Sequence, residues 1–407
     1  MKIILYEYAS GGGYAGQKLP TGILAEGFGM LRCLTTDFKA NGDEVTLLLD
    51  ARLSRLNPPI NADHVFPVMY PEEPEKLLTS LAKKYDSIYI IAPETGRTLQ
   101  TIVELAEKTG KTTLNSKSTT IAKVADKALL YAHLKEQGFP APKTLLINIS
   151  DTFQKTKQTI NQQLSYPLVF KPVDGVGCNG LSILKEESQI GKAIAKIKNE
   201  SKCSYFIAQE FIQGESVSVS LLATKNTALA VSLNRQNVAM AGPEEFSSYN
   251  GGCVPLDHPF KQEAFDLAEK VVKSINGLWG YVGVDLVLEP DMPYVVDVNP
   301  RLTTSYIGLR KVVNFNLAKA IANAVLKDNL PDKPENRGVA CFLKTETPKP
   351  TMLTFKNTAN MDAVVSPAFP LEKNAASCAL LIGNGETLDE ATFAIEEAKK
   401  KLYSIIG

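Results

Sequence analysis

Asp285, Asp297, Asn299 and Arg301 are the residues of this chain whose types and spacing point most directly to chemistry. They lie in two apolar, strand-like runs joined by a Pro-Asp-Met-Pro turn. Residues two apart in a strand share a face, so Asp297, Asn299 and Arg301 project together, and a hairpin brings Asp285 beside them. Two carboxylates and an amide oxygen suit Mg²⁺, which is usually shared with substrate phosphates.

Arg301 adds a cation beside these oxygen ligands. A guanidinium can bind a carboxylate or a phosphoryl group in bidentate fashion. The alternative is a hairpin whose polar face meets water, with Arg301 paired to Asp297.

A second group of residues suits phosphate binding. The sequence YPLVFKP predicts a strand that ends near Lys171, and the loop DGVGCNG follows, with Asp174, Gly175, Gly177 and Gly180. The N–H groups of such a loop can cover phosphates while the lysine supplies a point charge. The loop lacks the Gly-Lys-Ser/Thr of a Walker A motif, and a bare glycine-rich hairpin is the alternative.

The segment SYFIAQEFIQGESVSVSLL predicts two strands and a short polar link. Backbone groups of the link, at Phe211 and Ile212, could hydrogen-bond an adenine. Glu210 and Glu215 could accept hydrogen bonds from the adenine amino group and the ribose hydroxyls. The alternative is that both glutamates are solvent-facing residues at strand ends.

The first part of the chain must supply a rigid frame. Strand-like runs at 2–8, 44–50 and 87–92 alternate with helical patterns, including 23–40. This alternation predicts a parallel sheet of βαβ units. Ligands bind beyond the carboxyl ends of such strands. The residues expected there are Glu7, Ser10, Gly11, Gly12, Gly13, Pro93, Glu94 and Thr95.

The glycine run lacks the spacing of a dinucleotide fingerprint, so NAD is not implied. A flexible loop without a ligand is the alternative for that run. A helix at 119–137 is expected to carry Asp126 and Lys127 and to end at Gly138-Phe-Pro-Ala-Pro. Near the C-terminus, VACFLKTE and CALLIGNG predict strands, and 387–403 predicts an amphipathic helix after a linker at 327–338.

Composition narrows the classes of partner. Lysine plus arginine and aspartate plus glutamate both number 44, and there is no basic run, so neither nucleic acid nor a membrane surface is expected as a partner. No apolar run is long enough to cross a bilayer, and a strand-like run follows Met1, so a cytoplasmic protein is expected. Six scattered cysteines without C-x-x-C pairs argue against a disulfide framework, and the distant histidines against a zinc site.

Taken in order, these motifs resemble the ATP-grasp superfamily. The residues that carry the resemblance are Asp126-Lys127, VFKPVDGVGCNG, QEFIQGESVSVSLL, SLNRQ, GYVGVDLVL and VVDVNPRLTTSYIGL. Together with LYEYASGGG and GILAEGFGML, they are similar to the archaeal-type branch that includes the tyramine–L-glutamate ligases of methanofuran biosynthesis. The joint order of the motifs is more specific than any one of them.

The resemblance implies an α/β protein with an ATP-grasp fold. An N-terminal parallel-sheet (pre-ATP-grasp) domain is expected at 1–115 and a two-lobed ATP-binding core at 116–330. The segment 335–407 lies beyond the strongest resemblance, and its strand and helix patterns alone predict a small C-terminal α/β cap.

The resemblance also implies roles for the residues above. Lys127 and Lys171 would contact ATP phosphates, the loop 174–180 would close over them, and Glu210 with Glu215 would hold adenosine. The metal residues would bind one or two Mg²⁺, with Mn²⁺ as the alternative ion. Family members often carry glutamate where this chain has Asp297 and a ribose-binding carboxylate where it has Ser216.

The implied activity is ATP-dependent ligation of a carboxylate to an amine through an acyl phosphate, which requires no protein nucleophile. Lys171 and Arg301 are the expected catalytic residues, with Arg301 orienting the carboxylate or the acyl phosphate. Residues expected to contact the two substrates are Glu7, Ser10, Gly12, Glu26, Asn234, Arg235 and Gln236. Arg235 has the alternative of a buried structural ion pair.

Three functions remain open on the sequence. The first is ligation of L-glutamate to tyramine, the second is the same reaction on another amino acid and amine, and the third is a non-catalytic nucleotide-binding regulator. The expected partners are small molecules, and a homodimer is a possible assembly.

Overall fold

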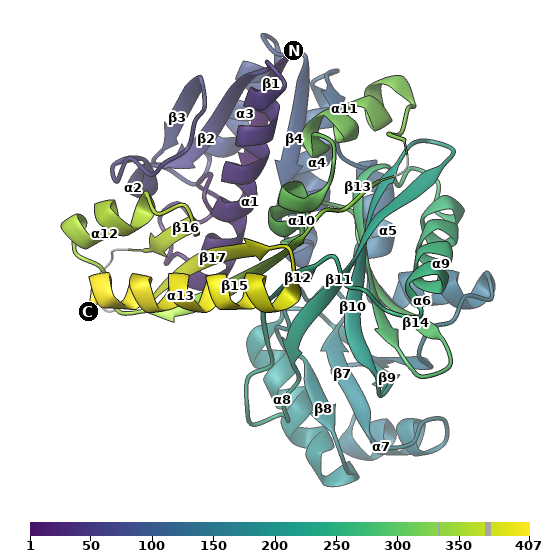
Figure 1. Ribbon diagram of the computed structural model, residues 1–407. Helices are drawn as coiled ribbons and strands as arrows, with labels where there is room; N and C mark the ends of the chain where they lie inside the picture. Colours follow the sequence, from purple (N-terminus) through teal and green to yellow (C-terminus); the bar gives the residue numbers. More distant parts are fainter. Residues whose placement is uncertain (333, 371–375) are drawn as a thin grey trace.

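The computed structural model describes residues 1–332, 334–370 and 376–407 of the chain (Figure 1). Its strands form a five-stranded, a four-stranded and an eight-stranded sheet. The predicted α/β class with an N-terminal parallel sheet is confirmed. No helix in these described ranges is long and apolar enough to span a membrane.

The N-terminal sheet is entirely parallel, in the order β3-β2-β1-β4-β5. Ile3 and Leu5 of β1 face α1, while Ile4 and Tyr6 face α3 and α4, so helices cover both faces. The elements are β1 (Lys2–Glu7), α1 (Thr21–Ala40), β2 (Glu44–Asp50), α2 (Ala51–Ser54), β3 (His64–Val68), α3 (Glu73–Ala82), β4 (Ser87–Ile91), η1 (Thr95–Arg97), α4 (Thr98–Lys108) and β5 (Thr112–Thr113).

The single helix predicted at 119–137 is wrong, because the structure divides it into α5 (Ser118–Ala125) and α6 (Lys127–Glu136). Asp126 between them is extended, with φ −85° and ψ 107°, and its carboxylate accepts hydrogen bonds from the N–H groups of Ala128 and Leu129. Aspartate is a better N-cap than an interior helical residue. The break places Lys127 at the first position of α6, where its N–H donates to the carbonyl of Val173.

The four-stranded sheet is antiparallel, in the order β6-β9-β7-β8, and forms a small lobe. Phe170 and Phe206 point to one face, where Ile160 and Ile197 from two helices cover them. Side chains alternate along a strand, so Lys171 projects to the opposite face. The elements are β6 (Thr144–Asn148), α7 (Phe153–Asn161), β7 (Leu168–Pro172), β8 (Ser182–Leu184), η2 (Glu187–Gln189), α8 (Ile190–Glu200) and β9 (Tyr205–Glu210).

The eight-stranded sheet runs β14-β13-β10-β11-β12-β15-β17-β16. Because β15 pairs with β12, the C-terminal strands extend this sheet and do not form a sheet of their own. The elements are β10 (Glu215–Ala223), β11 (Ala228–Ala239), β12 (Ser248–Val254), α9 (Lys261–Ser274), β13 (Gly280–Leu288), β14 (Pro293–Asn299), α10 (Tyr306–Val312), α11 (Leu317–Lys327), β15 (Val339–Thr347), α12 (Met352–Ala359), β16 (Val364–Phe369), β17 (Ser377–Gly385) and α13 (Leu388–Ile406).

The C-terminal strands and the final helix fall where the sequence predicts them, with Thr387 accepting a hydrogen bond from the N–H of Glu390 at the start of α13. The predicted linker and C-terminal segment also contain 333 and 371–375, which lie outside the described residues.

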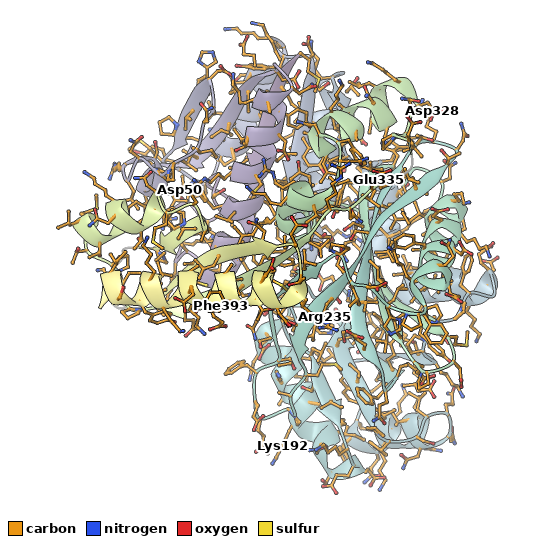
Figure 2. The ribbon with its side chains drawn as sticks, in the orientation of Figure 1. Asp50, Lys192, Arg235, Asp328, Glu335 and Phe393 are labelled. Carbon is orange, nitrogen blue, oxygen red and sulfur yellow. A yellow bond between two sulfur atoms is a disulfide. The ribbon has the colours of Figure 1, made fainter. Side chains whose placement is uncertain are left out.

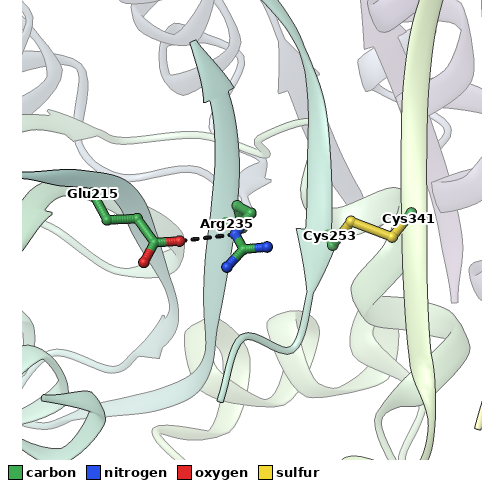
Figure 3. Close-up of a disulfide and its surroundings, with 4 residues drawn as sticks. All are labelled: Glu215, Arg235, Cys253 and Cys341. Atoms are coloured by element: carbon green, nitrogen blue, oxygen red, sulfur yellow. Dashed lines mark hydrogen bonds and ion pairs between the residues drawn. A yellow bond between two sulfur atoms is a disulfide. The ribbon is translucent and has the colours of Figure 1, made fainter. Parts of the chain in front are cut away.

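The cysteine spacing argues against a disulfide framework, and it does not predict the one disulfide that the described part of the chain contains. Cys253 of β12 and Cys341 of β15 are direct cross-strand partners and are joined by a disulfide (Figure 3). The pairing depends on strand register between segments 88 residues apart, which no local spacing motif reveals.

Helix α1 fastens the N-terminal domain to the rest of the molecule and lies between the parallel sheet and the C-terminal strands in Figure 1. Its buried Asp37 accepts hydrogen bonds from Arg310 Nε at 2.9 Å and from the Tyr306 hydroxyl at 2.6 Å. Arg32 donates to the carbonyl of Val364 in β16 at 2.7 Å. These contacts fix the position of the N-terminal domain relative to the large sheet.

Candidate active site

A cavity of about 260 Å³ lies where the small lobe, the large sheet and the N-terminal domain meet. It gathers residues that are far apart in the sequence. The site residues predicted from the sequence that line it are Glu26, Lys127, Lys171, Gly175, Gly177, Glu210, Phe211, Ile212, Gln236, Asp285, Asp297, Asn299 and Arg301.

The β13–β14 hairpin supplies the oxygen ligands of the cavity. Asp285 and Asp297 are direct cross-strand partners, and a bulge follows Asp285. Gln236 Nε2 donates to Asp285 Oδ1 at 2.9 Å and Asn299 Nδ2 donates to Asp285 Oδ2 at 3.0 Å. The nitrogen of the Asn299 amide is thus used on Asp285, so its oxygen is the atom that remains for a cation.

The oxygen atoms of Asp285, Asp297 and Asn299 suit Mg²⁺ as ligands. Burial, together with the charge of Asp297, raises the pKa of Asp285 to about 6, so two adjacent carboxylates repel each other here. A divalent cation would relieve that repulsion. In the described part of the chain, no group of three histidine, cysteine, aspartate or glutamate residues could hold a metal. The ion would therefore complete its shell with phosphate oxygens and water, as Mg²⁺ commonly does.

Two lysines lie beside these carboxylates. Lys127 Nζ is ion-paired with Asp297. Burial opposes its charge, but Asp297, Glu94 and Asp285 outweigh that cost and raise the pKa of Lys127. Lys171 has no carboxylate within ion-pair distance among the residues that the structure describes, and its ammonium lies 3.5 Å from the carbonyl oxygen of Val296. Burial and the charge of Lys127 lower the pKa of Lys171 to about 8.

The glycine-rich loop reaches the cavity only in part. Gly175 and Gly177 line the cavity, and Gly177 has a positive φ of 61°. Asp174 points elsewhere: its carboxylate accepts a hydrogen bond from the N–H of Gly96 at 2.8 Å. Gly180 donates its N–H to Glu200 at 2.6 Å. The side chain of Asp174 is therefore engaged with the N-terminal domain, and Gly180 fastens the far end of the loop to α8.

The link between β9 and β10 also lines the cavity. Glu210, Phe211 and Ile212 all contribute to the wall. The N–H of Lys143 donates to Glu210 Oε2 at 3.3 Å, which orients that carboxylate. Ser216 lines the cavity as well.

Glu215 is not among the residues that line the cavity, and its carboxylate points toward Arg235 of β11 (Figure 3). Figure 2 shows where Arg235 lies in the molecule. Arg235 Nε donates to Glu215 Oε1 at 2.8 Å, and His258 Nε2 lies 3.9 Å from the other oxygen. Alternation along β10 explains this placement, since Ser216 and Glu215 must face opposite sides. The ion pair is partly exposed, with 39% of the Arg235 side chain accessible, and not buried as the alternative for Arg235 supposed.

Arg301 pairs with Glu94, and not with Asp297 as the alternative reading of the hairpin supposed. Its Nε donates to Glu94 Oε1 at 2.8 Å and its Nη1 to the carbonyl of Leu302 at 3.1 Å. Burial opposes the charge of Arg301, but Glu94 and Glu26 raise its pKa. Glu94 lies just after β4, at the sheet edge where ligands are expected, and that position was its only signal in the sequence.

Besides Arg235, four predicted substrate contacts lie away from the cavity wall. Glu7 is buried and accepts hydrogen bonds from the N–H groups of Ala9 and Ser10 and from the Ser10 hydroxyl. Gly12 packs against Val68, in a conformation with φ 97°. These residues shape the loop after β1, because the buried carboxylate gathers the N–H groups of the turn. Asn234 is buried and donates to Ser218 and Ser220.

Glu26 of α1 lines the cavity and lies beside Lys344 of β15, a residue that no sequence motif singles out. Lys344 of β15 is ion-paired with Glu26 Oε1, and Thr304 donates to Glu26 Oε2 at 3.1 Å. The C-terminal segment therefore reaches the margin of the site. Lys344 belongs to no motif in the sequence. It reaches the margin of the site because β15 pairs with β12 in the large sheet.

Comparison with known families matches two parts of the chain. Residues 44–121 match the pre ATP-grasp 3 domain and residues 124–305 match the ATP-grasp domain. The chain is 30% identical over 337 residues to the tyramine–L-glutamate ligase of Methanocaldococcus fervens, which covers 82% of this chain and 98% of that protein.

Solved structures show the same fold. A putative ATP-grasp superfamily protein from Archaeoglobus fulgidus superimposes with a TM-score of 0.64 and 25% identity, covering 95% of this chain and 99% of that one. The biotin carboxylase domain of Hydrogenobacter thermophilus 2-oxoglutarate carboxylase, crystallised with MgADP and bicarbonate, has a TM-score of 0.72 at 13% identity, covering 98% and 89% of the two chains.

Proposed function

Because the chain belongs to the ATP-grasp family, we propose that it is an ADP-forming ligase that joins L-glutamate to tyramine through an acyl phosphate. The observation that carries the proposal is the meeting, in one cavity, of Lys127 and Lys171, the carboxylate pair of the hairpin, and Arg301. The substrate pair rests on the similarity to the tyramine–L-glutamate ligase of M. fervens.

The cavity divides into an adenosine end and a reaction end. Backbone groups at Phe211 and Ile212, with the Glu210 carboxylate, would hold the adenine. Ser216 takes the place beside the ribose, because Glu215 is occupied by Arg235. The phosphates would then lie under Gly175 and Gly177, whose N–H groups can face them.

At the reaction end, the substrate carboxylate must approach the γ-phosphate despite the negative charge on both. Lys127 and Lys171 supply positive charge on the protein side. Mg²⁺ held by Asp285, Asp297 and Asn299 would neutralise further charge on the phosphates. Arg301 would orient the carboxylate, since its guanidinium reaches the cavity while Glu94 fixes one of its nitrogens.

The substrate assignment is tested by following ADP release from ATP and Mg²⁺ with L-glutamate, with and without tyramine. The proposal expects release that requires both substrates and a glutamyl amide detected by mass. A protein that forms ADP only with another amine or another amino acid would overturn the substrate pair. A protein that binds ATP and turns over no pair would instead be a nucleotide-binding regulator.

A further inference from the structure

Glu94 has one oxygen that the fold leaves without a partner. Only 5% of the residue is exposed, and Oε1 accepts the hydrogen bond from Arg301. Oε2 is buried and has no hydrogen-bond partner within the described ranges 1–332, 334–370 and 376–407. Leaving a charged acceptor without a donor is costly, so an unpaired carboxylate oxygen in a cavity wall indicates a ligand that donates to it.

The position of Glu94 indicates which substrate would donate a hydrogen bond to this oxygen. Glu94 lines the cavity and is held against Arg301, the residue proposed to orient the substrate carboxylate, so Glu94 lies at the reaction end. The carboxylate substrate and the phosphates are anionic and would be repelled there. The amine arrives as an ammonium ion, which is both a hydrogen-bond donor and a cation.

The loop that carries Glu94 is also tied to the glycine-rich loop. The Thr95 hydroxyl donates to the carbonyl of Asp174 at 3.1 Å, and the N–H of Gly96 donates to its carboxylate. The two residues after Glu94 therefore anchor the loop that lines the phosphate region. These two hydrogen bonds hold the loop after β4, which carries Glu94, against the glycine-rich loop.

We propose that Glu94 is a further catalytic residue, which binds the ammonium group of the incoming amine through Oε2 and accepts one of its protons. The inference rests on the proposed ligase function. The deprotonated nitrogen attacks the acyl carbon, the C–N bond forms, and the C–O bond to phosphate breaks. The second proton lost by the nitrogen leaves with the phosphate, and Glu94 returns its proton to solvent, so charge and atoms balance.

The test compares two nucleophiles in the Glu94→Gln variant. Tyramine is an ammonium ion at neutral pH and must lose a proton before attack, whereas hydroxylamine is uncharged there and attacks an acyl phosphate to give a hydroxamate. Glutamine keeps an oxygen that can accept from Arg301 Nε, but it cannot take up a proton at this pH. ATP, Mg²⁺ and L-glutamate are present in both assays.

The inference expects amide formation with tyramine to fall by roughly 100-fold or more, the usual size of general acid–base catalysis. Hydroxamate formation and the KM for L-glutamate in that assay should stay within about threefold of wild type, a change of about 0.7 kcal/mol. Glu104→Gln on α4, where the side chain is 45% accessible and pairs only with Lys108 of the same helix among the described residues, is the matched control and should leave both reactions intact.

Equal losses with both nucleophiles would overturn the inference, because they would mean that Glu94 serves only to hold Arg301. A KM for L-glutamate that rises in the hydroxylamine assay would also overturn it and assign Glu94 to the acidic substrate. Wild-type protein that forms no hydroxamate would contradict the proposed function itself, a result distinct from a selective loss in the variant.

Discussion

Lys127 and Asp297 form an ion pair across 170 residues of sequence, linking the start of α6 to the end of β14. The pair explains why Lys171, and not Lys127, is the lysine with the lowered pKa, since Lys127 has a carboxylate partner. Among the described residues, the hydrogen bond of the Lys171 ammonium goes to the carbonyl of Val296, at 3.5 Å. Of these two lysines, Lys171 therefore gains most from the arrival of a phosphate.

Replacing Lys171 by methionine should lower kcat/KM for ATP by roughly 100- to 1000-fold, the range seen when one preorganised charge-stabilising group is removed. Steady-state kinetics at saturating L-glutamate and tyramine provide the measurement. Lys185→Met, at an exposed position after β8, is the matched control and should behave as wild type. A Lys171 variant with normal kinetics would remove this lysine from the phosphate site.

Asp297→Ala should abolish most Mg²⁺-dependent ADP formation, with a loss of about 100-fold or more, because both a metal ligand and the partner of Lys127 disappear. The dependence of the rate on Mg²⁺ concentration should shift to higher concentrations in Asp297→Glu. Asp291→Ala, in the exposed turn between β13 and β14, serves as the control. An unchanged Mg²⁺ dependence in both Asp297 variants would place the metal elsewhere.

Arg235→Ala should leave the KM for ATP within about twofold and the free energy of unfolding within about 1 kcal/mol of wild type. Its pair with Glu215 is partly exposed, and such pairs contribute little. Ser216→Ala, inside the cavity, should raise the KM for ATP in the same assay. A large ATP defect in Arg235→Ala alone would restore Glu215 and Arg235 to the nucleotide site.

Glu7 should make the free energy of unfolding decrease as the pH rises. Burial raises the pKa of Glu7 from 4.5 to about 7, although hydrogen bonds from Ser10 and Ala9 oppose the shift. Between these values the folded state keeps a proton that the unfolded chain has released, so stability present below pH 4.5 is lost as the pH rises through about 7. The shift corresponds to roughly 3 kcal/mol.

Urea unfolding from pH 4.5 to 8 gives the free energy of unfolding of wild type and Glu7→Gln at each pH. The contribution of Glu7 is the difference between the slopes of these two free energies against pH. Glu136→Gln, at an exposed position near the end of α6, should keep the wild-type slope. Identical slopes for wild type and Glu7→Gln would mean that the Ala9 and Ser10 hydrogen bonds hold Glu7 ionised throughout.

The sequence predicts the parts of the site that local pattern determines. Period-two alternation and a short turn are enough to place Asp285 opposite Asp297, and a strand followed by glycines is enough to bring Lys171 near the flexible loop. The parallel N-terminal sheet follows in the same way from alternating strands and helices.

What the sequence does not predict depends on pairing between distant segments. Lys344 and the disulfide partner Cys341 reach their positions only because β15 adds to β12. The outward direction of Glu215 depends on which face of β10 meets the cavity. The break at Asp126 shows the remaining cause, since a side-chain cap overrides a helical pattern that continues through it.

In the proposed mechanism, a substrate carboxylate attacks the γ-phosphate of ATP in this cavity. The most direct measurement uses L-glutamate labelled with ¹⁸O in its carboxylates, together with ATP, Mg²⁺ and tyramine, and determines by mass where the label goes. We expect one ¹⁸O in the inorganic phosphate and none in the nucleotide, which is released as ADP. Label found in AMP, or phosphate released without ¹⁸O, would contradict it.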